Sequence, residues 1–126
     1  MKRVATAALL AALVLALCIG CRIVMERQIG RITDTMDQID ASLAAGDTVE
    51  ALEISREFLR KWDAMHDQLC YFIQHEHLDP LENVFAVLPY YIEQGEISLA
   101  RAQCRIVQTA AGHIMKTERV TPSNIL

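Results

Sequence analysis

A long run of apolar residues opens the sequence, directly after two basic residues. Within residues 4–21 only Thr6 is plainly polar, and the run continues for three residues past Arg22. A helix rises about 1.5 Å per residue and the hydrocarbon core of a bilayer is roughly 30 Å thick, so about 20 apolar residues can span it. The long side chain of Arg22 can extend its charge to the interface. We therefore expect residues 1–25 to form a membrane anchor that contacts the lipid bilayer through residues 4–24.

Beyond the anchor, apolar residues recur at alternating steps of three and four, the spacing that places them on one side of a helix. The first such stripe continues helically from the anchor, and Gly46 is suited to the position just after a helix. Asp47 can then cap a long second helix that ends near Gln74. The first stripe consists of Ile29, Ile32, Met36, Ile39 and Leu43, and the second of Val49, Leu52, Phe58, Leu59, Trp62, Met65, Leu69, Phe72 and Ile73.

Two further helices are expected after a connection at residues 75–78. Asp79 is predicted to cap a short third helix, with Glu82 completing a capping box, a bend at Pro89 and an end at Gly95. The third stripe consists of Leu81, Val84, Phe85, Leu88, Tyr91 and Ile92, and the fourth of Ile97, Ala100, Cys104, Val107, Ala111 and Ile114.

The pattern ends after Lys116, where residues 121–124 are turn-like and only Ile125 and Leu126 are available to pack. No stretch alternates apolar and polar residues with period two, so strands are not expected. A faint internal repeat relates Ile39, Leu43, Gly46, Asp47 and Ala51 at one fixed offset to Leu88, Ile92, Gly95, Glu96 and Ala100.

Each half of the repeat has the pattern of a helical hairpin. The likeness to tetratricopeptide repeats is loose, because the offset is longer than their period. Short connections make neighbouring helices antiparallel, and two hairpins that cannot bury their stripes alone should pack together. The predicted fold is all-α: an N-terminal transmembrane helix continuing into an antiparallel bundle of about four helices. This bundle forms a single domain at residues 26–126, with an irregular tail.

Composition and charge narrow the classes of function. Hydrophobic residues make up 52% of the chain and are concentrated in the anchor. The formal net charge is -4, and the acidic residues follow Met25. Nucleic-acid binding is therefore not expected, because phosphates require clustered Lys and Arg side chains.

The way in which the chain is attached to a membrane has two interpretations. A cleavable signal peptide has a shorter apolar region, which favours an uncleaved helix. However, residues 17–21 resemble a lipoprotein cleavage box that would make Cys21 a lipidated N-terminus, although Cys18 stands where such boxes usually carry Leu. Positive charges flank both ends of the run, so they leave the orientation open. A short tail before a signal-like segment normally stays in the cytoplasm, which places the bundle on the outer face.

Small residues recur at every fourth position of the anchor. They form a smooth ridge on which a second membrane helix can pack, because helix association in lipid depends on close van der Waals contact. The alternative is an alanine-rich anchor without a partner. The ridge consists of Ala8, Ala12, Ala16 and Gly20.

Several potential metal ligands gather near the end of the second helix. Asp63, His66, Asp67 and Cys70 are spaced by three and four residues, and His75 and His77 follow. Zinc takes about four nitrogen, sulfur or oxygen ligands, and His with Cys four apart on a helix supplies two. The alternative is a polar flank beside the Trp62 stripe, and no second pair has metal-ligand spacing. We therefore assign no metal, cofactor or catalytic residue.

Other chemistry has weaker support. Cys70 and Cys104 are expected to be buried free thiols, with a disulfide as the alternative. A nucleophilic pair of Cys and His lacks an identifiable oxyanion site, so the chain is not expected to be an enzyme. The larger aromatic residues are expected in the core or at its rim, with a ligand cradle as the alternative: Trp62, Phe85, Tyr90 and Tyr91.

Several short motifs follow one another along the chain: the N-terminal anchor, Gly46-Asp47, the Trp62 helix, residues 75–79, residues 97–101 and residues 122–126. Their order and spacing resemble the bacterial domain of unknown function 4363 family. The resemblance implies a small membrane-anchored helical protein, typical of Gram-positive bacteria, with no catalytic residues to transfer. Cys21 departs from the plain anchor of that family.

Two hypotheses of function follow. The first is a non-catalytic, membrane-tethered interaction or scaffold domain whose bundle or anchor ridge contacts another membrane protein or a second copy of the chain. The second is a metal or redox sensor that uses His66, Cys70, His75 and His77.

Overall fold

The computed structural model of the chain describes residues 1–117, and this part consists of four α-helices without strands. The helices are α1 (Lys2–Ala44), α2 (Thr48–Leu69), α3 (His75–Glu93) and α4 (Ile97–Thr117). The predicted all-α fold is therefore confirmed. The expected turn at residues 121–124 and the packing of Ile125 and Leu126 lie outside the described residues.

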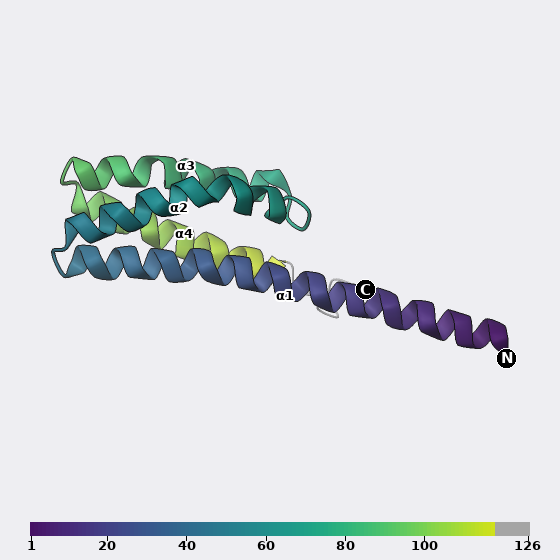
Figure 1. The fold of residues 1–126 in the computed structure, drawn as a ribbon. Coiled ribbons are helices and arrows are strands. Elements are labelled where there is room, and N and C mark those ends of the chain that lie inside the picture. The colour runs from purple at the N-terminus through teal and green to yellow at the C-terminus, as the bar shows by residue number, and fades with distance from the viewer. Residues whose placement is uncertain (118–126) are drawn as a thin grey trace.

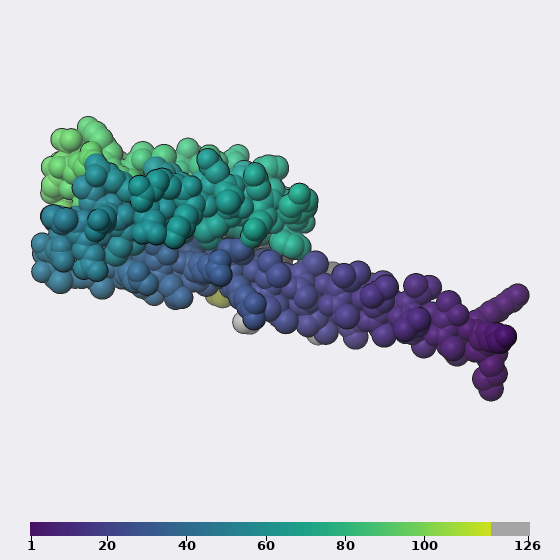
Figure 2. Space-filling model, in the orientation of Figure 1, coloured from purple at the N-terminus to yellow at the C-terminus, as the bar shows by residue number. Residues whose placement is uncertain are grey.

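The four helices form an antiparallel bundle at one end of a long α1 (Figure 1). Helix α1 packs against α2 and α4, and α3 packs against the same two helices on the other side. Among the described residues, the part of α1 before Met25 projects from the bundle as a narrow stem, residues 2–24 (Figure 2). The α2–α3 connection lies at the end of the bundle that faces this stem, and the other two connections lie at the opposite end (Figure 1).

The bundle core is built from the predicted stripes. All five predicted residues of α1 are buried, and burial along this helix begins at Met25. In the third and fourth stripes, only Tyr91 and Ile97 are partly exposed. The stripe of α2 needs correction: Val49 is 75% exposed, whereas Ala51 and Ser55 are buried. Small side chains can line a close helix contact, which a pattern of large apolar residues does not reveal.

Both glycine-containing turns have the same hydrogen-bonding pattern. The amide of Gly46 donates to the carbonyl of Leu43 at 3.1 Å, and that of Asp47 donates to Ser42 at 2.9 Å. The equivalent bonds in the second turn are Gly95 to Ile92 at 3.2 Å and Glu96 to Tyr91 at 2.9 Å. This is the Schellman motif, which needs a left-handed residue, and the two glycines have φ of 80° and 75°. The internal repeat thus corresponds to two matching helical hairpins.

The connection between α2 and α3 differs from the prediction. Helix α2 ends at Leu69, earlier than Gln74, and α3 begins at His75, so the proposed connection at residues 75–78 is helical. Asp79 is therefore inside α3 and does not cap it. Beginning the helix earlier buries Leu78 completely, which contributes about 1.5–3 kcal/mol and outweighs one hydrogen bond lost at a proline, about 1 kcal/mol. The third helix is consequently longer than expected, at 19 residues.

Candidate functional site

The predicted His and Cys ligands converge at the α2–α3 connection. His66 lies in the last turn of α2, Cys70 is the residue that caps this helix, and His75 is the first residue of α3. The backbone amide of Cys70 donates to the carbonyl of His66 at 2.9 Å, which stacks these two residues one turn apart. The short turn that follows brings His75 back towards them.

The three side chains are in contact through the Cys70 sulfur. Its Sγ atom lies 3.5 Å from Nδ1 of His75 and 3.6 Å from Nδ1 of His66. Nε2 of His66 is almost as near, at 3.7 Å, and the two imidazole ring centroids are 5.7 Å apart. One potential ligand atom from each of the three residues lies within 4.8 Å of the other two. Their arrangement is that of a possible metal site.

Two carboxylates extend this cluster. One ligand atom each from His66, Asp79 and Glu82 also lie within 4.8 Å of one another. Asp79 follows His75 by four residues and Glu82 follows Asp79 by three, so all three lie on one face of α3. Sequence reasoning missed these carboxylates because it assigned both to a helix cap. The spacing of His75 and Asp79 is the signal that would have found them.

Three of the predicted ligands do not join either group within residues 1–117: Asp63, Asp67 and His77. Residue 77 follows His75 by two positions, and each helical residue turns by about 100°, so its side chain lies on a different face of α3. Asp63 and Asp67 are exposed. The cluster therefore consists of His66, Cys70 and His75 with two carboxylates beside it.

The charges around the cluster are negative. Burial raises the pKa of the Cys70 thiol, and the carboxylates of Asp67, Asp79 and Glu82 raise it further. Both effects disfavour a thiolate in this position, because it would be desolvated and next to like charges. The thiol is accordingly protonated at neutral pH when no cation is bound.

The cluster rests on the aromatic part of the core. Trp62 is 1% exposed and lies edge-on to His66, with ring centroids 5.6 Å apart. Trp62 also contacts Phe85, which is 2% exposed, at a ring-centroid distance of 4.7 Å, and Phe58 at 6.2 Å. Tyr91 is half-buried and Tyr90 is 60% exposed. These positions agree with the expected core and rim aromatics.

Both cysteines of the bundle are free thiols. The prediction of free thiols is confirmed for Cys70 and Cys104, but the predicted burial holds only for Cys104, because Cys70 is half-buried. Cys104 is 1% exposed within α4, and burial raises its pKa to about 12. A thiol with this pKa is a poor nucleophile at neutral pH, because the thiolate is the reactive form.

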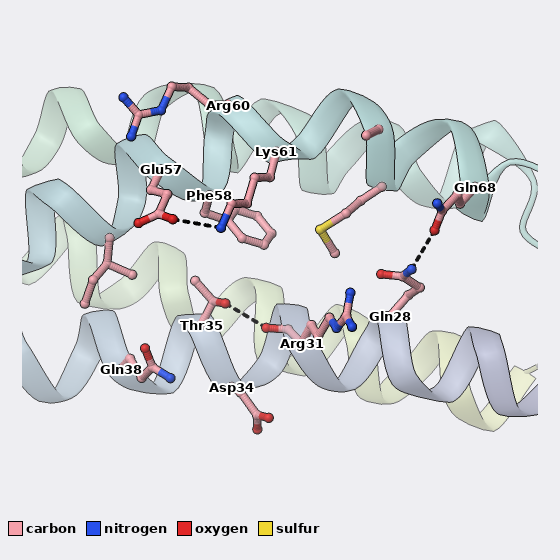
Figure 3. A pocket seen from close by; sticks show the side chains of 13 residues that line it. Gln28, Arg31, Asp34, Thr35, Gln38, Glu57, Phe58, Arg60, Lys61 and Gln68 are labelled. Carbon is pink, nitrogen blue, oxygen red and sulfur yellow. Dashed lines mark hydrogen bonds and ion pairs between the residues drawn. The ribbon is translucent and has the colours of Figure 1, made fainter.

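An open groove runs between α1 and α2 (Figure 3). It has a volume of about 860 Å³. Charged side chains from both helices line it, including Arg31, Asp34 and Arg60, while Nζ of Lys61 lies 2.7 Å from a carboxylate oxygen of Glu57. At the end nearer the stem, Nε2 of Gln28 donates to Oε1 of Gln68 at 2.6 Å. Apolar side chains of Ile54, Phe58 and Met65 also line the groove, which is therefore mixed in character and open to solvent.

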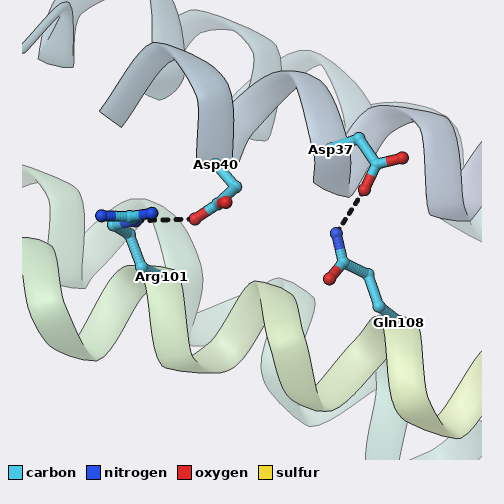
Figure 4. Close-up of polar contacts among 4 residues, drawn as sticks. All are labelled: Asp37, Asp40, Arg101 and Gln108. Atoms are coloured by element: carbon cyan, nitrogen blue, oxygen red, sulfur yellow. Dashed lines mark hydrogen bonds and ion pairs between the residues drawn. The ribbon is translucent and has the colours of Figure 1, made fainter. Parts of the chain in front are cut away.

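Polar contacts join α1 to α4 on another side of the bundle (Figure 4). Nε of Arg101 donates to a carboxylate oxygen of Asp40 at 2.8 Å. Further along the same two helices, the amide of Gln108 donates to Asp37. These contacts lie at the surface and add to the core packing between α4 and the helix that carries the stem.

The stem is the described helix that is long and apolar enough to cross a membrane, judged by length and composition alone. Its best 18-residue window has a mean hydropathy of 2.6 and is 0% buried. Cys18 and Cys21 are both exposed on it. At its far end, Nε of Arg22 forms an ion pair with Glu26 at 3.0 Å.

Comparison with known protein families identifies the family of the bundle. A family model described as a domain of unknown function (DUF4363) matches residues 24–125. The match begins where burial along α1 begins, and it covers the bundle without most of the stem. No curated protein and no solved structure matches the chain.

Proposed function

This chain belongs to the DUF4363 family, as the match over residues 24–125 shows, and we propose that the bundle carries the function of the family's domain. We propose that this protein is a membrane-tethered, non-catalytic interaction domain. Residues 4–24 lie in the bilayer, and the bundle contacts another membrane protein or a second copy of the chain. The observation that carries the proposal is an exposed apolar stem that continues without interruption into a polar-surfaced bundle.

The stem supports the tether. Leu10, Leu13 and Leu17 are each more than half exposed, and neighbouring apolar side chains surround them. A contiguous exposed apolar surface of this kind is unfavourable in water, whereas a helix in lipid satisfies all of its backbone hydrogen bonds internally. Helix α1 is continuous over 43 residues, so a bilayer around the stem would hold the bundle close to its surface. We further propose that the N-terminus is in the cytoplasm and the bundle on the outer face, because a short tail before a signal-like segment normally stays in the cytoplasm.

Two surfaces are available for a protein partner. In the bundle, the groove between α1 and α2 is wide, open and lined by charges of both signs, which suits a polar protein surface better than a small apolar ligand. In the bilayer, the small-residue ridge provides a surface for a second helix. Its four residues are all exposed: Ala8, Ala12, Ala16 and Gly20.

Fractionation of cells tests the tether. Leu13→Arg with Leu17→Arg places two charges near the middle of the span, at about 2.5–3.5 kcal/mol each, and should release the protein from the membrane fraction. The matched control is Leu99→Arg with Ile106→Arg, at two exposed apolar positions of α4, and should leave the protein membrane-bound. Equal behaviour of the two double variants, or a wild-type protein soluble without detergent, would overturn the proposal.

Cys21→Ser separates a spanning helix from a lipid anchor. A membrane-spanning helix should keep this variant in the membrane fraction, because a single side chain changes little of the apolar length. Release of the variant would instead identify a lipidated Cys21 as the attachment.

Photo-crosslinking in intact membranes tests the interaction. A photoreactive residue at Gln38, which lines the groove, should form a defined protein adduct. The same residue at Val87, an exposed position of α3, is the control and should not. Absence of an adduct from Gln38, or the same adduct from both positions, would contradict docking at this groove.

A further inference from the structure

The geometry at the α2–α3 connection points to a metal site. We propose that His66, Cys70 and His75 bind a divalent transition-metal ion of the zinc class, and that a carboxylate of Asp79 or Glu82 supplies the fourth ligand. Binding would release the thiol proton of Cys70 to solvent and form a metal–thiolate bond without any change of oxidation state.

The distances agree with a tetrahedral ion. Zinc lies about 2.3 Å from thiolate sulfur and about 2.1 Å from imidazole nitrogen, so a tetrahedral site holds sulfur and nitrogen about 3.6 Å apart. The Cys70 sulfur lies 3.6 Å from Nδ1 of His66 and 3.5 Å from Nδ1 of His75. Two of the three edges that meet at the sulfur, those to the histidine nitrogens, therefore have the required length.

Hydrogen bonding explains the cluster less well. A thiol has one proton and its sulfur is only a weak acceptor, so Cys70 can donate to one histidine and accept no more than a weak hydrogen bond from the other. Both ring nitrogens of His66 lie at nearly equal distances from the sulfur, 3.6 and 3.7 Å, so neither is singled out as the partner of a directional bond. A metal ion would select one of these nitrogens and could contact both histidines together with the sulfur.

The spacing of the residues provides two ligand pairs. His66 and Cys70 are four residues apart at the end of α2, and His75 and Asp79 are four apart at the start of α3. Residues four apart on a helix face the same direction, so two antiparallel helices present two pairs to a common point. Imidazole and thiolate ligands favour zinc-class ions over magnesium or calcium, and nearby carboxylates favour any dication electrostatically.

A bound ion would link α2 to α3 at the end of the bundle nearest the stem. Gln68 lies between His66 and Cys70 in the sequence and accepts a hydrogen bond from Gln28 of α1. Both ligands of α2 are therefore two residues away from a direct contact with the helix that continues into the stem. Metal binding should stabilise the α2–α3 connection, because it links two helices that are otherwise joined only by packing and a short turn.

Cobalt titration of the full-length protein in detergent tests this site. Cys18→Ser with Cys21→Ser is the background, because the stem carries a second pair of cysteines. After chelation, Co²⁺ should bind at one ion per chain with a thiolate-to-cobalt charge-transfer band, and Zn²⁺ should displace it. Cys70→Ser should remove the band, and circular dichroism should show that this variant keeps its helices.

Matched histidine variants complete the test. His75→Gln should weaken binding at least about tenfold, since the loss of a ligand costs at least as much as the loss of its support. His77→Gln, on another face of the same helix, should leave the affinity unchanged, and Asp79→Asn with Glu82→Gln should weaken it. Absence of the band, its persistence in Cys70→Ser, or equal weakening by the two histidine changes would overturn the proposal. None of these results depends on the membrane tether.

Discussion

Alanine substitution of four glycines in the bundle should change the free energy of unfolding, lowering it at two positions and raising it at the other two. A methyl group added at Gly30, Gly46, Gly95 or Gly112 meets no atom within 4 Å, so none of the four alanine variants introduces a clash. The backbone differs: Gly46 and Gly95 have positive φ in the helix-ending turns, whereas the other two lie inside helices. The backbone conformation at each glycine therefore decides whether alanine raises or lowers the free energy of unfolding.

The expected magnitudes follow from this difference. A non-glycine residue in the left-handed region costs about 1–2 kcal/mol, so Gly46→Ala and Gly95→Ala should each lower the free energy of unfolding by that amount. Alanine is about 1 kcal/mol more favourable than glycine in a helix interior, so Gly112→Ala on the exposed face of α4 should raise it by up to about 1 kcal/mol. Gly30→Ala should act in the same direction.

Urea unfolding of the protein in mild detergent provides the assay. Trp62 is the only tryptophan and is 1% exposed in the core, so its fluorescence reports the unfolding of the bundle and not of the stem. The urea midpoint of each variant is compared with that of the wild type. A changed midpoint reports a change of stability when the slope of the unfolding free energy against urea stays the same.

This reasoning would be refuted if all four variants changed the free energy of unfolding in the same direction. Stabilisation by Gly46→Ala or Gly95→Ala would mean that these turns do not need a left-handed residue. Destabilisation by Gly112→Ala would mean that its methyl group meets a neighbour, contrary to the open space around it.

Three further predictions concern the core and its surroundings. Phe85→Ala should cost about 3–5 kcal/mol because it leaves a cavity beside the buried aromatic residues, whereas Tyr90→Ala, at an exposed position, should change the same unfolding midpoint little. Burial raises the pKa of Cys104 from an ordinary 9.0 to about 12, so the unfolded chain loses this proton first. The free energy of unfolding should be unaffected below pH 9 and fall by at most about 1.4 kcal/mol per pH unit between 9 and 12, and Cys104→Ala should lack this part of the alkaline loss. Asp40→Asn removes the half-exposed ion pair with Arg101 and should lower the unfolding midpoint at low ionic strength only, with the difference from wild type lost near about 1 M salt.

The candidate site was predicted from the sequence only in part. The spacing of His66 and Cys70 indicates that both lie on one side of a helix, and the structure places them in contact. The partnership of Asp79 was missed, because Asp followed by Pro is also the usual start of a helix. Only the burial of Leu78, which depends on the neighbouring helices, shows that α3 begins one turn earlier.

The sequence by itself determined the apolar stem, the number of helices and the two glycine turns, because each depends on residues within one or two turns of the chain. The tertiary structure decided where α2 ends and α3 begins, which small residues of α2 are buried, and which potential ligands meet. These features depend on contacts between helices far apart in the sequence, and the free energy of such packing can outweigh a local preference of about 1 kcal/mol.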